Sequence, residues 1–272
     1  MKSFQYVRPD NVDAIVALLA AHGTDARLLA GGTDLLVRHR LGHVRPAIVI
    51  DLKNAEGLSA DITPIGPSLR VGARVVMADL TGDPRVRRHF PALVEAARVV
   101  GSIQIRHRAT LAGNICNASP AADTAPALLV YGAIVNITGP AGDRSVPIAE
   151  FFLGPGSTVL ARGELVSSID LPIPAVPTGA SFGRLTRRRG VDLASLSVCC
   201  AVTSSGARIG LGAVAPRPIF IETASGDDMI ERAVAQASPI SDVRASREYR
   251  AAMLPVFIRR TLRTANDRLR DS

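Results

Sequence analysis

The chain has 272 residues, of which 47% are hydrophobic and 21% charged; this is the composition of a folded globular protein and argues against extended disorder. The length favours two domains over one. No stretch approaches the roughly 18 consecutive apolar residues of a membrane-spanning helix, and the N-terminus lacks a basic region followed by an apolar core. We therefore expect a cytoplasmic protein with no membrane insertion.

The formal net charge of +8 means that an anionic partner must be considered: nucleic acid, an anionic cofactor or an acidic protein surface. Ordinary solvated charge explains most of the basic character. The chain has no Trp and only three Tyr to stack on bases, which weakens nucleic acid, and we expect none to bind. The three cysteines, Cys116, Cys199 and Cys200, form no C-x-x-C pair. A zinc or iron–sulfur site cannot be built from them within one chain, so buried, reduced thiols are the favoured interpretation.

The first 57 residues have the pattern of a small α/β unit. A helix with capping residues at 9–11 ends at Gly23, and short apolar strands cover 26–30 and 47–52. After the first of these strands comes Gly31-Gly32, followed by the start of a second helix. A strand, a glycine turn and a helix N-terminus present free N–H groups, which suits a phosphate or pyrophosphate. The spacing matches neither known phosphate-loop motif, so a tight turn without a ligand stays an equal alternative.

The middle of the chain contains a stretch of small and polar residues, 109–124, set between strongly patterned flanks. Its small side chains let a ligand approach the backbone closely. Thr110, Asn114, Ser119 and Asp123 offer hydroxyl, amide and carboxylate groups to orient a ligand. Helix caps and turns use the same residue types, so a cap or turn is the alternative. Around this stretch we expect strands at 68–73 and 133–138 and helices at 75–80, 90–100 and 125–131.

Three prolines, Pro172, Pro174 and Pro177, indicate a linker, and we place a domain boundary near residue 176. The remainder has strand-like segments followed by helical segments, which is typical of a small α+β domain. The expected strands cover 194–202, 207–214 and 219–222, and the expected helices cover 227–236 and 247–268.

Four segments match one family in order and spacing: 28–36, 101–124, 163–172 and 182–194. On these residues the chain resembles the FAD-binding medium subunit of the molybdenum hydroxylases, the xanthine dehydrogenase and carbon monoxide dehydrogenase family. The resemblance implies an α+β fold with a two-subdomain PCMH-type FAD-binding domain over 1–176, whose subdomains cover about 1–57 and 58–176. A C-terminal domain with an antiparallel sheet plus helices would follow over 177–272.

The resemblance also implies which residues bind FAD. The pyrophosphate would lie on one turn and be clamped by a second segment, while polar groups orient the cofactor. The implied residues are Leu29, Ala30, Gly31, Gly32, Thr33, Asp34, Leu35, Thr110, Leu111, Ala112, Gly113, Asn114, Ser119, Asp123, Val166 and Arg184. Ala112 stands where relatives commonly have Gly, and His107 replaces a frequent Asn. We assign His107 no chemistry, and we expect no catalytic residue and no metal in this chain.

By resemblance, the chain is an oxidoreductase subunit that transfers electrons. The [2Fe–2S] clusters of a small subunit would pass electrons through FAD to an external acceptor, and a large subunit with a molybdopterin-type molybdenum cofactor would hydroxylate the substrate. The expected assembly is a dimer of heterotrimers. Two main alternatives stay open, a flavin-free structural subunit of the same complex and a stand-alone flavin oxidase, and a nucleic-acid binder ranks third.

Overall fold

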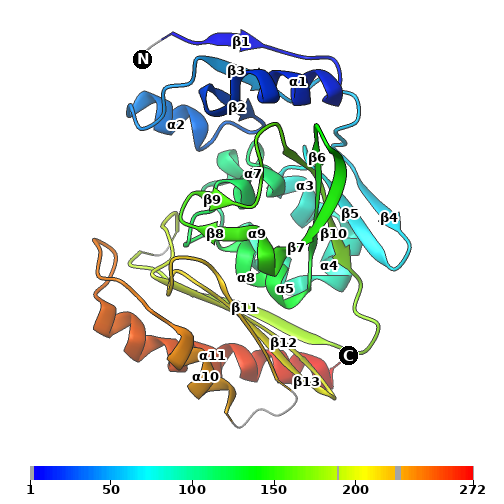
Figure 1. Ribbon diagram of the computed structural model, residues 1–272. Helices are drawn as coiled ribbons and strands as arrows, with labels where there is room; N and C mark the ends of the chain where they lie inside the picture. The colour runs from blue at the N-terminus through cyan, green and yellow to red at the C-terminus, as the bar shows by residue number, and fades with distance from the viewer. Residues whose placement is uncertain (1–2, 189, 224–227, 272) are drawn as a thin grey trace.

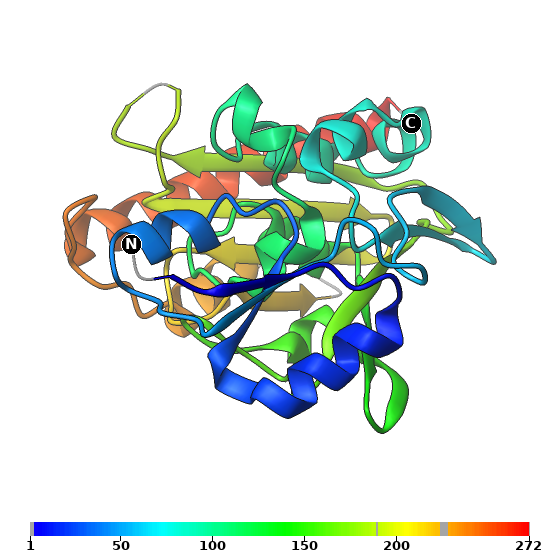
Figure 2. The same cartoon turned by 90° about the horizontal axis from the view of Figure 1, so that it is seen from above.

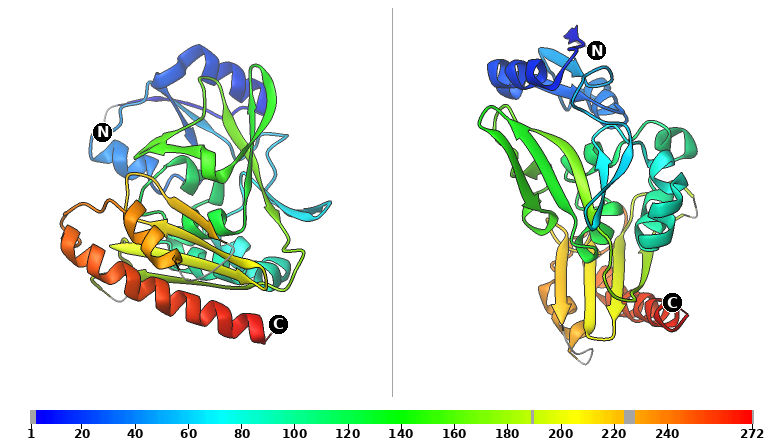
Figure 3. Two further views of the ribbon diagram at one scale, coloured as in Figure 1. Left: turned by 60° about the horizontal axis from the view of Figure 1, so that its bottom comes forward. Right: turned by 90° about the vertical axis from the view of Figure 1, so that its right-hand side faces the viewer.

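The computed structural model describes residues 3–188, 190–223 and 228–271. Figure 1 shows three stacked units: an N-terminal unit at the top, a middle unit, and a C-terminal sheet with the long helix α11 (Arg247–Arg270) at the bottom. The side view in Figure 3 shows the same order. This mixture of sheets and helices confirms the α+β class. Within the described ranges, no helix is long and apolar enough to cross a membrane.

The N-terminal unit is a parallel three-stranded sheet in the order β1-β3-β2 with two helices. The central strand β3 is buried at all four residues, as a continuous apolar run predicts for a parallel strand. Seen from above in Figure 2, this unit lies across the rest of the molecule. Its elements are β1 (Gln5–Val7), α1 (Val12–His22), η1 (Gly23–Asp25), β2 (Ala26–Leu29), α2 (Leu35–Arg40) and β3 (Ile48–Asp51).

Local capping sets the ends of the first helix. The side chain of Asn11 accepts a hydrogen bond from the Ala14 amide at 2.9 Å, and Gly23 ends α1 at a φ of 50°. These are the ends that the sequence predicts. The second helix begins at Leu35, with Asp34 as its N-cap residue but without a side-chain capping bond.

The middle unit is a five-stranded antiparallel sheet in the order β4-β5-β10-β6-β7, with short helices packed beside it. The hairpin β8-β9 stands apart from this sheet. The strands are β4 (Ile62–Ile65), β5 (Ser68–Gly72), β6 (Ile134–Gly139), β7 (Gly142–Pro147), β8 (Phe152–Gly154), β9 (Ser157–Thr158) and β10 (Leu165–Pro172). The helices are α3 (Met77–Gly82), α4 (Pro84–His89), α5 (Pro91–Arg98), α6 (Ile103–Arg106), α7 (Leu111–Cys116), α8 (Thr124–Val130) and α9 (Ile148–Phe151).

The last strand of this unit in sequence is its central strand in space. β10 pairs with β5 on one side and with β6 on the other, both antiparallel. The register shifts between Val166 and Ser168, which marks a bulge next to Val166. The middle sheet therefore depends on residues that lie about 100 positions apart, as the ion pair between Arg70 and Asp170 also shows.

The C-terminal unit is a four-stranded antiparallel sheet in the order β11-β12-β13-β14. Its two faces are covered differently: α11 packs on β11 and β12, while α5 and α8 pack on strands of the sheet from the middle unit. Its elements are β11 (Gly179–Leu185), β12 (Leu196–Thr203), β13 (Gly206–Gly212), β14 (Ile219–Thr223), α10 (Met229–Gln236) and α11. The helix expected over 227–236 is present, but its predicted first residue, Asp227, lies outside the described residues.

Successive side chains of β12 point to opposite faces of the C-terminal sheet and so belong to two different hydrophobic cores. Cys199 joins the large core shared with the middle unit, whereas Cys200 joins the smaller core beneath α11. Both thiols are fully buried, and burial raises the pKa of each. The C-terminal sheet is thus packed directly against the middle unit, and the boundary near residue 176 stays a prediction.

β13 of the C-terminal unit approaches α8 of the middle unit so closely that position 210 requires glycine. We predict that Gly210→Ala destabilises the chain by about 2 kcal/mol, because the added Cβ would overlap the Pro126 carbonyl oxygen of α8. The free energy of unfolding from denaturant titration measures this. The control Gly154→Ala places its Cβ in open space and should change the stability by less than about 0.5 kcal/mol. Equal effects of the two variants would contradict this view of the interface.

Candidate functional site

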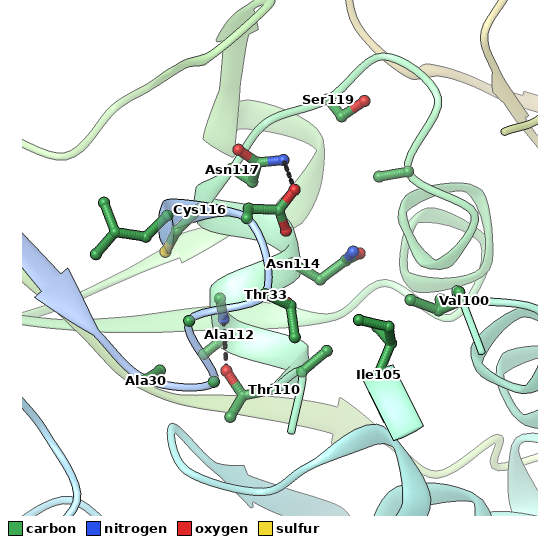
Figure 4. Close-up of a pocket in the computed structure, with 18 of the residues that line it drawn as sticks. Ala30, Thr33, Val100, Ile105, Thr110, Ala112, Asn114, Cys116, Asn117 and Ser119 are labelled. Atoms are coloured by element: carbon green, nitrogen blue, oxygen red, sulfur yellow. Dashed lines mark hydrogen bonds between the residues drawn. The ribbon is translucent and has the colours of Figure 1, made fainter. Parts of the chain in front are cut away.

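A cavity of about 670 Å³ collects residues from all three units. The turn after β2, the loop from the end of α5 to α6, the helix α7 and the segment that follows it form most of its wall. Val166 of β10 and the loop before β12 complete it. Figure 4 shows how the labelled side chains of Thr33, Val100, Ile105 and Asn114 surround the space.

The glycine turn lies against a second backbone segment. A Cβ at Gly31 would overlap the carbonyl oxygen of Arg108, so only glycine allows this approach. Gly32 has a φ of 75° and accepts a hydrogen bond from the Leu36 amide at 3.1 Å. In the described part of the chain, the amides of Gly31, Gly32, Thr33 and Asp34 have no hydrogen-bond acceptor. Four neighbouring donors are thus free to bind an anion at the cavity wall.

The facing wall begins with α7, which the sequence had presented as a stretch of small and polar residues. Thr110 caps the helix, since its hydroxyl accepts a hydrogen bond from the Gly113 amide at 3.0 Å. The Ala109 carbonyl accepts a bond from Met77 at 2.8 Å, which fixes the helix start to the middle unit. Leu111 faces the core and is fully buried, while Ala112 lines the cavity and is 6% exposed. The expected cap is therefore present, and the same stretch lines the cavity, while its role as a ligand cradle stays a prediction.

Amide side chains connect the parts of the wall. Asn117 donates from Nδ2 to Asp34 Oδ1 at 3.3 Å and so bridges the turn and the end of α7 (Figure 4). Asn114 accepts a hydrogen bond from the Thr124 hydroxyl at 2.6 Å through Oδ1. The Asn114 Nδ2 group therefore remains available as a donor at the cavity.

A buried ion pair stands at the cavity wall, where Asp123 lines the cavity and Arg184 lies behind it. Arg184 Nη1 lies 2.9 Å from Asp123 Oδ2, and the other carboxylate oxygen of Asp123 is buried without a partner among the described residues. Burial raises the pKa of Asp123 to about 6, although the charge of Arg184 and its hydrogen bond lower it. Arg184 also donates to the Asp192 carbonyl at 3.2 Å, so it holds the loop that contributes Asp192 and Leu193 to the cavity.

Burial and neighbouring charges shift the pKa values of the two other acids of the cavity wall, Asp34 and Asp192, in opposite directions. Desolvation raises the pKa of Asp34, and the charge of Arg38 opposes that shift. At Asp192 burial also raises the pKa, but the Leu193 amide and the charges of Arg187 and Arg188 outweigh it and hold the pKa below its ordinary value. Asp192 is therefore the acid of the wall that is most firmly ionised.

Comparison with known proteins assigns this arrangement to a family. A family model described as the FAD binding domain in molybdopterin dehydrogenase matches residues 2–174, which include most of the cavity wall. The chain belongs to this family. It is an oxidoreductase subunit with an FAD-binding domain, as the sequence resemblance implies.

Individual relatives support this membership along nearly the whole chain. The carbon monoxide dehydrogenase medium chain of Afipia carboxidovorans is 32% identical, with 99% of both chains covered. The nicotine 6-hydroxylase medium subunit of Paenarthrobacter nicotinovorans is 30% identical, with 98% of this chain and 99% of the relative covered. Among solved structures, carbon monoxide dehydrogenase from Hydrogenophaga pseudoflava superposes with a TM-score of 0.92 at 31% identity, covering 98% of both chains.

The cavity fits an FAD molecule in size and in the chemistry of its walls. A volume of about 670 Å³ lies in the range of ligand sites. The free amides of the glycine turn match the pyrophosphate of the cofactor, and the unpartnered oxygen of Asp123 matches a hydroxyl donor. The methyl group of Ala112 is largely buried in the α7 wall and does not displace the Thr110 cap.

Most of the residues predicted for FAD binding meet at this cavity. Those that line it are Ala30, Gly31, Gly32, Thr33, Asp34, Leu35, Thr110, Ala112, Gly113, Asn114, Ser119, Asp123 and Val166. Leu29, Leu111 and Arg184 do not line it. Leu111 belongs to the core, and Arg184 acts on the wall through its contacts with Asp123 and Asp192.

Sequence reasoning did not assign several residues of the wall. Val100, Gly101 and Ile105 come from the junction of α5 and α6, where the only local signal was a helix-ending glycine. Asn117 lies inside the small, polar stretch and could have been chosen for its amide. Further lining residues are Arg27, Leu28, Arg38, Val44, Leu52, Ala73, Val99, Ala109, Cys116, Ala121, Ala122, Gly156, Asp192 and Leu193.

The raised pKa of Asp123 gives a pH-dependent stability in the cofactor-free chain. Its folded pKa of about 6 lies above the ordinary value of 3.8. Its contribution to stability is therefore fully present below pH 3.8 and is lost as the pH rises through about 6. We predict that carboxyl-carbon NMR finds the midpoint near pH 6 and that Arg184→Met raises it further.

The control for this titration is Arg187→Met, which removes a guanidinium that pairs with Asp192 instead. It should leave the midpoint of Asp123 nearly unchanged. A wild-type midpoint near the ordinary value, or equal shifts in both variants, would contradict the assignment.

Proposed function

We propose that this chain is the FAD-binding electron-transfer subunit of a heteromeric molybdenum hydroxylase and that FAD binds in the cavity described above. One observation carries the proposal: the match to the FAD-binding family covers the two backbone segments that approach each other at Gly31 and Arg108. In this arrangement the pyrophosphate lies against the amides of residues 31–34. The start of α7, from Thr110 to Asn114, closes on it from the other side.

The remaining predicted residues orient the rest of the cofactor. Asp123 offers its unpartnered oxygen to a hydroxyl of the cofactor, and Ser119 lines the same end of the cavity. Val166 contacts the cofactor through its backbone, since it lines the cavity and is directly followed by the bulge in β10. Arg184 keeps Asp123 in place and supplies a positive charge behind it.

Bound FAD accepts and releases electrons singly or in pairs, which links one-electron carriers to two-electron acceptors. The work of this chain is to hold the cofactor, shield it and set its electrostatic surroundings. Its acids in the cavity wall are engaged in ion pairs or raised in pKa by burial, and we give none of them a role as a general acid or base.

The proposed partners follow from the names of the relatives. Medium chains and medium subunits belong to enzymes with further chains. We assign the [2Fe–2S] clusters to a small subunit and the molybdenum cofactor with substrate hydroxylation to a large one, in a dimer of heterotrimers located in the cytoplasm. An external acceptor takes the electrons from the flavin. The net charge of +8 suits docking of acidic partner surfaces.

Purification of the complex from its native source tests this function. We expect three kinds of chain, FAD released on denaturation, and iron and molybdenum in the partner chains. A three-chain complex without flavin would support the structural-subunit alternative, for which Ala112 in the α7 wall is the specific observation. A lone active flavoprotein would support the oxidase alternative.

Asn114 allows a specific test of cofactor binding. We predict that Asn114→Asp weakens FAD affinity about tenfold or more, because a carboxylate replaces the free amide donor and repels the pyrophosphate. The Thr124 hydroxyl can still donate to the new carboxylate, so the fold is retained. Fluorescence titration of the deflavinated chain with FAD measures the affinity.

The matched control is Asn266→Asp, the same exchange at an exposed position on α11. It should leave the FAD affinity within about twofold of the wild type, since a remote surface charge is screened. Unchanged affinity in Asn114→Asp would contradict the placement of FAD against α7.

A further inference from the structure

Ala213, just after β13, has a backbone conformation that requires support. Its φ of 61° is in the left-handed region, which disfavours a residue with a Cβ. The residue is 7% exposed, and both of its backbone polar groups are used. Its amide donates to the Pro120 carbonyl at 2.7 Å, and its carbonyl accepts from Arg250 Nη1 at 2.9 Å. Ala213 therefore links a helix of the C-terminal unit to residue 120.

The residue that accepts this hydrogen bond, Pro120, is next to the cavity wall. Pro120 lies between Ser119 and Ala121, both of which line the cavity. From another side, the Gly156 amide donates to the Ala118 carbonyl at 2.9 Å. The segment that presents Ser119 and Asp123 is thus held by backbone hydrogen bonds at two points, of which one is Ala213.

Arg250 of α11 makes the contact with the Ala213 carbonyl, and its environment is unusual for an arginine. It is 1% exposed in α11, and its Nε is buried without a partner among the described residues. A buried charge is costly unless it is paired, and Asp242 supplies the pair at 2.5 Å from Nη2. A guanidinium can reach a carboxylate and a carbonyl at once in a fixed fork, which an apolar side chain or a lysine cannot do.

Asp242 connects the same cluster to a second part of the wall. Its Oδ2 lies 2.6 Å from Arg244 Nη2, and Arg244 Nη1 donates to the Ala194 carbonyl at 3.2 Å. Ala194 directly follows Leu193, which lines the cavity. One carboxylate thus anchors two arginines, each of which holds the backbone next to a different part of the cavity wall.

We propose that Arg250 and Asp242 are positioning residues of the cofactor site, which set the geometry of the 119–123 and 192–194 walls from outside the cavity. The inference rests on the proposed binding of FAD in this cavity. It extends the site to residues 242–250, which lie beyond the 2–174 region matched by the FAD-binding family. The C-terminal unit then takes part in cofactor binding through its backbone contacts.

The same helix contains a matched control. Arg268 of α11 donates to the Ala180 carbonyl at 2.6 Å and pairs with Glu95, so it also joins a sheet carbonyl and a carboxylate. Its partners Ala180 and Glu95 lie at least four residues from any residue that lines the cavity, whereas Pro120 and Ala194 each adjoin one. A purely structural role for such arginines predicts equal effects on FAD binding at both positions, whereas a positioning role predicts an effect at Arg250 alone.

The test compares Arg250→Met with Arg268→Met in the full chain. We expect both to lower the melting temperature without FAD, but only Arg250→Met to weaken FAD affinity by about tenfold and to alter the visible circular dichroism of the bound flavin. Equal FAD affinity and equal flavin dichroism in the two variants would overturn the proposal. Failure of the wild-type chain to bind FAD would instead overturn the proposed function, so the two failures are distinguishable.

Arg250→Lys keeps the inference testable if Arg250→Met does not fold. Lysine retains the charge and the pair with Asp242 but cannot hold both acceptors in one fork. We expect faster hydrogen exchange at the Ala213 amide and an FAD affinity below that of the wild type. Exchange and affinity at the wild-type level in this variant would overturn the proposal.

Discussion

The close approach of two backbone segments at Gly31 is the constraint on which the site depends. The turn after β2 belongs to the N-terminal unit, and Arg108 precedes α7 of the middle unit. Because no side chain separates them, the free amides of the turn lie beside the capped start of α7, and the cavity forms where the two units meet. Any residue with a Cβ at position 31 would push these units apart. Gly31 is therefore both a contact between units and a part of the site.

Several elements of the fold and part of the cavity wall were predictable from local chemistry. Asn11 and Gly23 fix the ends of α1, and a continuous apolar run gave β3, because capping and burial act within a few residues. The glycine turn and the polar side chains of 109–124 indicated the cavity wall. Helix α7 was not predicted, since its small residues have weak helical periodicity and it is held by the Thr110 cap and by strand-like bonds to residues 75–77. Asp192 and Leu193 reach the cavity from a distant loop, and no local signal in their sequence marks that position.

Charge is distributed unevenly around the site. The chain as a whole is basic, yet the cavity wall includes Asp34, Asp123 and Asp192, each placed near an arginine. Arg184 pairs with Asp123 at 2.9 Å, and Arg187 and Arg188 lie 3.7 Å from Asp192. The arginines thus neutralise the acids locally, which leaves the free amides of the turn as the main attraction for an anionic cofactor. For the FAD binding proposed above, the backbone dipoles of the turn therefore matter more than the net charge of the chain.

The central place of β10 in the middle sheet has a consequence for synthesis of the protein. The strand that joins β5 to β6 is the last of that sheet to leave the ribosome, and the bulge beside Val166 leaves with it. Without β10, the edges of β5 and β6 that it occupies would have no ladder partner. The loop with Leu193 and the Ala213 support of Pro120 come later still. The wall of the proposed FAD site therefore acquires its last contacts only after most of the chain has been synthesised.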